Sequence, residues 1–148
     1  MCKYLESDKF KHCVFPDSLT LYEVIRRGAR VSNNGPMLGY RIKDEQSGTL
    51  PYVWLKYSEV IDRSTRIAHA FRVMGLPSGQ QTFIGIYSKN RPEWVIVEHA
   101  AYNFNNVVVP LYETIGSEAC SFILNQTDIG LVVCDVVDKA IGRILDKF

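Results

Sequence analysis

Three short, nearly continuous apolar runs stand out in the second half of the chain, at residues 83–87, 107–111 and 131–134. Continuous rather than alternating hydrophobicity indicates strands that are buried on both faces, as in parallel sheets. The segments between them, Pro92–Phe104 and Glu118–Gln126, have helical spacing of apolar residues. This β-α-β-α-β order predicts an α/β fold, with a parallel sheet flanked by helices and joined by right-handed crossovers.

A last helix is predicted from about Val136, where apolar residues recur at spacings of three and four up to Phe148. Its other side carries Lys139, Arg143 and Lys147 at intervals of four residues, and Asp135 is placed to pair with Lys139. A solvated helix face explains these cations best. The alternative is a patch for anionic phosphates, with Lys139 and Arg143 as the candidate binding residues.

The first half of the chain predicts a helix, a hairpin and a second helix. The first helix starts at Thr20 and stops at Asn33–Pro36, because Asn and Gly accept left-handed backbone angles and proline cannot continue a helical turn. Two extended stretches, Leu38–Lys43 and Tyr52–Tyr57, then predict an N-terminal β-hairpin. Ser58 is expected to cap the second helix, whose buried stripe comprises Val60, Ile67, Ala68, Phe71 and Met74.

The start of the helix after the first apolar run is a candidate ligand site. Asn90 is a possible N-cap, Pro92 fits the first turn, and Glu93 has the spacing of a capping-box partner. In parallel α/β sheets, ligands bind at the carboxyl ends of strands, near such helix starts. We favour a purely structural helix start, because no glycine-rich phosphate loop precedes it.

Two further features resemble functional motifs only superficially. Ser47-Gly48-Thr49 is similar to a phosphate-binding loop, but its place inside the hairpin connection predicts an exposed turn. His99 lies beside Glu98 in an apolar helix, where a packed side chain is a better expectation than a catalytic one. No Rossmann, Walker or nucleophile-elbow motif occurs, so the sequence yields no catalytic residue.

Composition excludes several other classes of protein. The 148 residues are 47% hydrophobic and 22% charged with a net charge of +1, which is typical of a globular protein without a nucleic-acid footprint. No Cys or His spacing indicates a metal site, and the four cysteines are expected to be free thiols in a reducing compartment. The chain has no apolar segment long enough for a signal peptide or a membrane span.

Three segments resemble one family, the long-chain acyl-CoA synthetases of the adenylate-forming superfamily. They are T-L-Y-E-V-I-R-R-G-A-R-V-S-N-N-G-P-M-L-G at 20–39, Y-V-W-L-K-Y-S-E-V at 52–60, and F-I-G-I-Y-S-K-N-R-P-E-W-V-I-V-E-H-A-A-Y-N-F-N-N-V-V-V-P-L-Y at 83–112, which continues through residue 119. The resemblance extends over residues 20–135. It implies that residues 20–148 are an incomplete N-terminal portion of an AMP-binding domain, preceded by an irregular lead-in at 1–19.

The resemblance implies an enzyme that joins a long-chain fatty acid to coenzyme A through an acyl-adenylate, using ATP and Mg²⁺. Lys139 and Arg143 would then be candidates for the phosphates of coenzyme A. The full-length relatives are expected to be membrane-associated, facing the cytosol from the endoplasmic reticulum or the mitochondrial outer membrane. The family's phosphate loop, its adenine- and fatty-acid-binding motifs and its catalytic lysine have no counterpart here, so this chain alone is expected to be inactive and to bind no cofactor.

Two alternatives remain at this stage. A non-catalytic interaction or regulatory module with the same fold is the first. A small flavodoxin-like nucleotide-binding protein is the second, and the missing phosphate loop counts against it.

Overall fold

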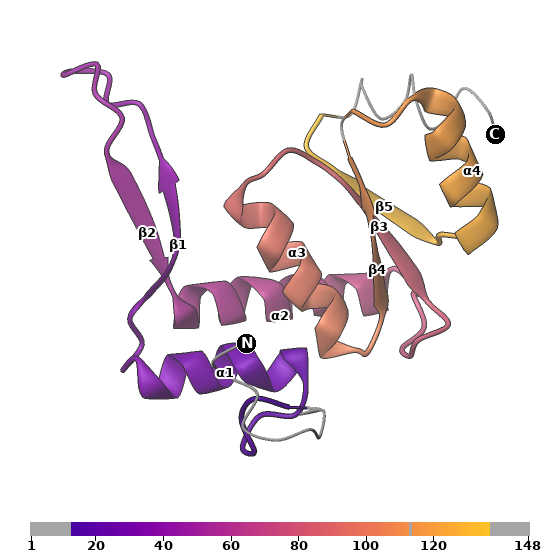
Figure 1. Cartoon of the computed structure of the whole chain (residues 1–148), viewed down its shortest axis with the longest axis horizontal. Coiled ribbons are helices and arrows are strands. Elements are labelled where there is room, and N and C mark those ends of the chain that lie inside the picture. The colour runs from indigo at the N-terminus through magenta and orange to yellow at the C-terminus, as the bar shows by residue number, and fades with distance from the viewer. Residues whose placement is uncertain (1–12, 113, 137–148) are drawn as a thin grey trace, which may run out of the picture.

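The computed structural model describes residues 13–112 and 114–136 and contains a parallel sheet, a hairpin and four helices within those ranges. Figure 1 shows the sheet between helices, with the hairpin projecting from one side. The elements in chain order are α1 (Leu21–Val31), β1 (Pro36–Arg41), β2 (Tyr52–Lys56), α2 (Tyr57–Val73), β3 (Phe83–Tyr87), α3 (Pro92–Asn103), β4 (Val107–Leu111), α4 (Ser117–Thr127) and β5 (Leu131–Cys134).

The three predicted strands form one parallel sheet in the order β4-β3-β5. Their bounds agree with the sequence prediction, and Ile84 of β3 lies opposite Val108 of β4 and Leu131 of β5. Helices α2 and α3 cover one face and α4 covers the other, so the predicted α/β class is confirmed (Figure 1). The predicted final helix and the side chains of Lys139, Arg143 and Lys147 lie outside the described residues.

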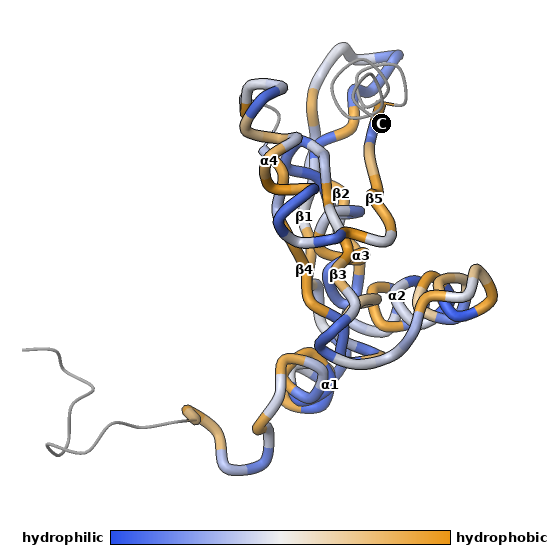
Figure 2. The backbone as a smooth tube through the Cα atoms, turned by 90° about the vertical axis from the view of Figure 1, so that its right-hand side faces the viewer, coloured by the Kyte–Doolittle hydropathy of each residue, from blue (hydrophilic) through white to orange (hydrophobic). Residues whose placement is uncertain are grey.

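Alternate residues of β3 point to two separate cores. Ile84 and Ile86 pack with Phe71 of α2 and Val97 of α3, whereas Tyr87 packs with Leu124 of α4. Apolar residues also run along β4 and β5, as the hydropathy colouring in Figure 2 shows. Burial on both faces explains why these strands lack alternation in the sequence.

Gly85 leaves room on the central strand for side chains of β4, β5 and the segment before β5. A Cβ at this position would lie 3.2 Å from Val132 Cγ2, 3.3 Å from Leu111 Cδ1 and 3.4 Å from Ile129 Cδ1. The glycine therefore occurs where two neighbouring strands and the segment before β5 close over β3.

The predicted hairpin is present, with β1 antiparallel to β2. Its first strand begins and ends earlier than expected, at Pro36–Arg41 rather than Leu38–Lys43. Asn33 and Asn34, with φ of 51° and 56°, already reverse the chain. Proline can therefore occupy the first position of the strand, where it disrupts no ladder.

The prediction that Ser58 caps α2 is wrong. The helix begins at Tyr57, which places Ser58 inside its first turn. The Asn34 side chain supplies the cap instead: Ser58 N donates to Asn34 Oδ1 at 2.8 Å, and Asn34 Nδ2 donates to Ser58 Oγ at 3.0 Å. A residue 24 positions earlier therefore satisfies one of the free N–H groups of the helix, which local sequence rules cannot foresee.

Replacing Asn34 by glycine is expected to lower the free energy of unfolding by about 1 kcal/mol, the usual contribution of a helix cap. Glycine retains the left-handed backbone and removes only the side chain. Asn33→Gly is the matched control, because it has the same backbone geometry. Urea denaturation of both variants tests the cap, and equal effects would contradict it.

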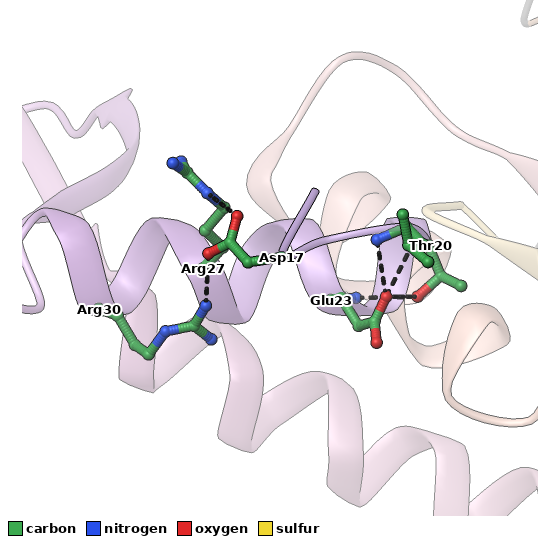
Figure 3. Close-up of polar contacts among 6 residues, drawn as sticks. Asp17, Thr20, Glu23, Arg27 and Arg30 are labelled. Carbon is green, nitrogen blue, oxygen red and sulfur yellow. Dashed lines mark hydrogen bonds and ion pairs between the residues drawn. The ribbon is translucent and has the colours of Figure 1, made fainter. Parts of the chain in front are cut away.

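Helix α1 is fixed at both ends by polar contacts, which Figure 3 shows. Thr20 Oγ1 accepts from Glu23 N at 3.2 Å, and Glu23 Oε2 accepts from Thr20 N at 3.0 Å, which completes a capping box. Asp17 contacts Arg27 at 2.9 Å and Arg30 at 3.1 Å. The hydrogen bond from Arg27 is the main reason why the pKa of Asp17 lies below its usual value.

Parts of the apolar sequence pattern remain exposed. Ile25 is the buried residue of α1, whereas Leu21 and Val24 are 58% and 43% exposed. Met74, predicted for the buried stripe of α2, follows the helix and is 62% exposed. No helix in the described ranges is both long and apolar enough to span a membrane.

Candidate functional site

The carboxyl ends of β3 and β5 border a cavity of about 190 Å³ beside the start of α3. The segment that connects β3 to α3 contributes Ser88 and Arg91, and β5 contributes Cys134, with Asp135 following it. This is the edge of a parallel sheet at which ligands bind. The remaining lining residues are Ile86, Glu93, Trp94, Val97 and Val133.

The polar groups of this cavity bind one another. Arg91 Nε donates to Glu93 Oε2 at 2.7 Å, Lys89 N donates to Asp135 Oδ2 at 3.3 Å, and Ser88 Oγ donates to the Lys89 carbonyl at 3.0 Å. The bond from Arg91 lowers the pKa of the Glu93 carboxyl, although partial burial opposes the shift. An anionic ligand at this edge would have to compete with Glu93 for the Arg91 guanidinium.

The predicted capping box at Asn90 is wrong. Helix α3 begins at Pro92, its N-cap is Arg91, and no side chain caps it. The carboxylate of Glu93, which the capping box needs, is instead bound by Arg91. Because the helix begins two residues after Asn90, Glu93 is its second residue and not its third, so the spacing of a capping box is lost. Pro92 does occupy the first turn, as predicted.

His99 is packed rather than presented to a cavity. Its ring lies edge-on to Tyr102, with centroids 5.6 Å apart, and its buried Nδ1 has no hydrogen-bond partner among the described atoms. Tyr102 donates to Glu98 Oε1 at 2.8 Å. Burial of the ring is the main cause of a lowered His99 pKa; Glu98 opposes the shift and Arg26 adds to it.

The lowered pKa predicts that acidification destabilises the fold through His99. The unfolded chain binds a proton at this residue more readily than the folded chain, so stability is complete above the ordinary pKa of 6.5 and declines as the pH falls below it. His99→Gln should flatten this part of the profile. Urea midpoints measured between pH 7.5 and 5 test the assignment, and parallel profiles for both proteins would contradict it.

The Ser47-Gly48-Thr49 candidate lies away from the edge of the sheet. Ser47-Gly48-Thr49 forms an exposed turn: Asp44 Oδ1 accepts from Ser47 N at 3.1 Å, and Gly48 has a φ of +68°. Cys13, Cys120 and Cys134 are not joined in disulfides, as expected. Within residues 13–112 and 114–136, no group of three or more His, Cys, Asp or Glu side chains is arranged to hold a metal ion.

Comparison with known proteins assigns this fold to a family. Residues 41–147 match the profile of the family described as "AMP-binding enzyme". The chain belongs to the AMP-binding enzyme family. This match includes β2, the whole parallel sheet and the edge formed by β3 and β5.

The similar curated proteins in this family are ligases. The chain is 46% identical over 126 residues to long-chain-fatty-acid–CoA ligase 5 of Rattus norvegicus, which covers 85% of this chain and 18% of that protein. It is 43% identical over 136 residues to long-chain-fatty-acid–CoA ligase 1 of Homo sapiens, with 92% and 19% covered. The resemblance noted in the sequence is confirmed, and the chain spans about a fifth of the length of these relatives.

Solved structures of AMP-binding enzymes share the architecture. The adenylation domain of a carboxylate reductase from Mycobacterium chelonae aligns with a TM-score of 0.71 and 25% identity, covering 86% of this chain and 21% of that domain. The A-PCP didomain of carboxylic acid reductase from Segniliparus rugosus, determined with AMP, aligns with a TM-score of 0.71 at 20% identity, covering 88% and 20%. These alignments confirm the α/β fold.

Proposed function

We propose that this chain is an early scaffold portion of a long-chain fatty acid–CoA ligase. The observation that carries the proposal is the 46% identity over 126 residues to a ligase of that kind. In this proposal residues 20–148 are an incomplete part of the AMP-binding domain, and residues 1–19 are a lead-in to it.

The complete enzyme would activate a long-chain fatty acid in two steps. The carboxylate attacks the α-phosphate of ATP, which forms an acyl-adenylate and releases pyrophosphate. The thiol of coenzyme A then takes the acyl group and releases AMP. Mg²⁺ and basic groups would neutralise the phosphate charge that such a reaction concentrates in one place.

The described residues fit a supporting role in this reaction rather than a chemical one. Arg91, Glu93 and Asp135 at the carboxyl edge of the sheet already have partners within the fold. The described ranges offer no metal-holding group of acidic side chains, so Mg²⁺ and ATP would be bound mainly by other parts of the enzyme. Lys139 and Arg143 remain the candidates for the phosphates of coenzyme A.

The complete enzyme would face the cytosol from the endoplasmic reticulum or the mitochondrial outer membrane. Membrane association suits a substrate whose long acyl chain partitions into lipid. No nucleic acid is proposed as a partner, because the net charge of +1 gives no electrostatic footprint for one.

The first test is ATP–pyrophosphate exchange by the purified chain with palmitate and Mg²⁺. We expect exchange at background, because the chain would supply scaffold and no catalytic group. The full-length rat relative is the positive control. Exchange above background by the purified chain would contradict the scaffold proposal.

The second test is a chimera in which this chain replaces the matching stretch of the rat relative. We expect the chimera to form palmitoyl-CoA in the presence of ATP and coenzyme A, whereas the relative lacking that stretch should be inactive. A folded chimera without activity, alongside an active parent enzyme, would contradict the assignment to this ligase family.

A further inference from the structure

The outer edge of β1 borders a second cavity that meets the segment between β3 and α3. This cavity, which we name the β1 groove, has a volume of about 590 Å³ and lies between Leu38–Arg41 of β1 and residues 90–93 and 95. Its volume falls within the roughly 300–1,000 Å³ of typical ligand clefts. No residue of β2 lines it, so it lies on the side of β1 that faces away from the hairpin partner.

The hydrogen-bond register of the hairpin tells which backbone groups face this groove. Ile42 N donates to the Pro51 carbonyl, and Asp44 N donates to the Thr49 carbonyl. In an antiparallel pair, hydrogen-bonded positions alternate along the strand. Since Ile42 is a bonded position, Gly39 and Arg41 are not, and their N–H and C=O groups point away from β2.

The β1 edge therefore presents the N–H and C=O groups of Gly39 and Arg41, which have no partner in β2, toward the groove. Among the described strands, β1 pairs with β2 alone. Gly39 is exposed and has no side chain to block an approaching backbone. An open edge of this kind is the template on which an extended segment adds as a further strand.

The charge of the groove favours an acidic segment. Arg41 is exposed, and its guanidinium carbon lies 4.7 Å from the centre of the Tyr52 ring. In the described part of the chain no carboxylate lies within ion-pair distance of Arg41, whereas Arg91 on the opposite wall is paired with Glu93. Two arginines and one glutamate thus line the groove, and Arg41 is the arginine among them that has no carboxylate partner in the described part of the chain.

Aromatic packing keeps Arg41 and the edge in place. Trp54 lies opposite Gly39, and three of its ring atoms lie within 3.0 Å of the point that a Cβ of Gly39 would occupy. Tyr52 lies opposite Arg41 and stacks with Trp54 at a centroid distance of 6.0 Å. The stacked rings cover the face of the hairpin on which the Arg41 guanidinium lies, and they leave the outer edge of β1 open to a ligand.

We propose that the β1 groove is a strand-acceptor site, which binds an extended acidic peptide segment as a third strand next to β1. The backbone of the segment would pair with the N–H and C=O groups of Gly39 and Arg41. A carboxylate of the segment would bind the Arg41 guanidinium. This role is separate from the proposed ligase function and does not depend on it.

The probe is a capped, fluorescein-labelled heptapeptide of alternating threonine and valine with one central glutamate. We expect saturable binding to the purified chain by fluorescence anisotropy, with slowed hydrogen exchange at the Gly39 and Arg41 amides. The same peptide with a central glutamine should bind about fivefold more weakly, the scale of one exposed charge pair. A peptide N-methylated at alternate residues should not bind.

Two variants distinguish the contribution of backbone pairing to peptide binding from that of the Arg41 charge. Arg41→Gln keeps the N–H and should reproduce the glutamine-peptide effect, whereas Arg41→Pro also removes the N–H and should weaken binding by about tenfold or more. Lys43→Pro is the matched control, because it changes the same edge beyond the residues that line the groove. It should bind the peptide like the parent chain.

Three results would overturn the proposal. The first is that the parent chain binds no peptide at millimolar concentration although its circular-dichroism spectrum and melting curve show that it stays folded. The second is equal binding by Arg41→Pro and the parent chain, with protection of amides elsewhere. The third is a stable dimer in analytical ultracentrifugation whose interface protects the Gly39 and Arg41 amides, since a second copy would then be the occupant of the edge.

Discussion

Replacing Asn106 by aspartate is expected to lower the free energy of unfolding by about 3–5 kcal/mol at pH 7, the range for an uncompensated buried charge. Asn106 is 6% exposed, and its Nδ2 donates to the Pro77 carbonyl at 2.9 Å and the Gly79 carbonyl at 3.2 Å. Aspartate has the same shape but places a carboxylate oxygen against two carbonyl oxygens. The donor is lost, and a charge is buried without a partner.

The loss should be reversed by acid, which distinguishes it from a packing defect. Burial next to two carbonyls would raise the pKa of the new carboxyl above that of the unfolded chain. The folded state of the variant then binds this proton more tightly than the unfolded state. The difference in stability between the variant and the parent should therefore shrink as the pH falls through the pKa of the folded state. Urea denaturation from pH 7 to pH 4 measures this difference.

Asn103→Asp is the matched control. Its Nδ2 also donates to a carbonyl, that of His99 at 2.7 Å, but its side chain is only half-buried and meets a single acceptor. A smaller loss is expected there, because water can solvate the charge. Equal losses at the two positions, or a loss at Asn106 that does not depend on pH, would contradict the role assigned to its amide.

Replacing Ile84 by alanine is expected to lower the free energy of unfolding by about 2–5 kcal/mol. Ile84 is fully buried at the centre of the sheet, in the cluster that joins β3 to α2 and α3. Truncation removes apolar burial and leaves a cavity that three packed elements cannot easily close. Such a loss is a large part of the 5–15 kcal/mol that typically stabilises a domain.

A graded series tests this expectation. Ile84→Val should cost about 0.5–1.5 kcal/mol, and Val73→Ala, at a position of α2 that is 89% exposed, should change stability by no more than about 0.5 kcal/mol. Urea midpoints and slopes measured together show whether the transition stays two-state. Similar values for Ile84→Ala and Val73→Ala would mean that β3 is not the centre of the cooperative core.

The sequence was sufficient for features that depend on local patterns of apolar residues. The three strand segments were predicted at their observed bounds, because burial on both faces leaves continuous apolar runs such as Phe83–Tyr87. The left-handed turn at Asn33 and Asn34 was predicted for a similar reason, since few residue types accept that backbone geometry. Family membership also followed from the sequence, because it depends on the order of residues rather than on their contacts.

The tertiary structure decided the polar contacts and the surfaces. Ser58 and Asn90 have the chemistry of helix caps, yet Asn34 supplies the contact at α2 and Arg91 binds the Glu93 carboxylate at α3. Which partner a polar side chain chooses depends on groups that are brought together only by folding. The β1 groove depends in the same way on how the hairpin register and the start of α3 are placed in space. Local periodicity therefore determined the strands and the helices, and the order of residues determined the family. Long-range packing determined the caps, the paired charges at the sheet edge and the open edge of β1.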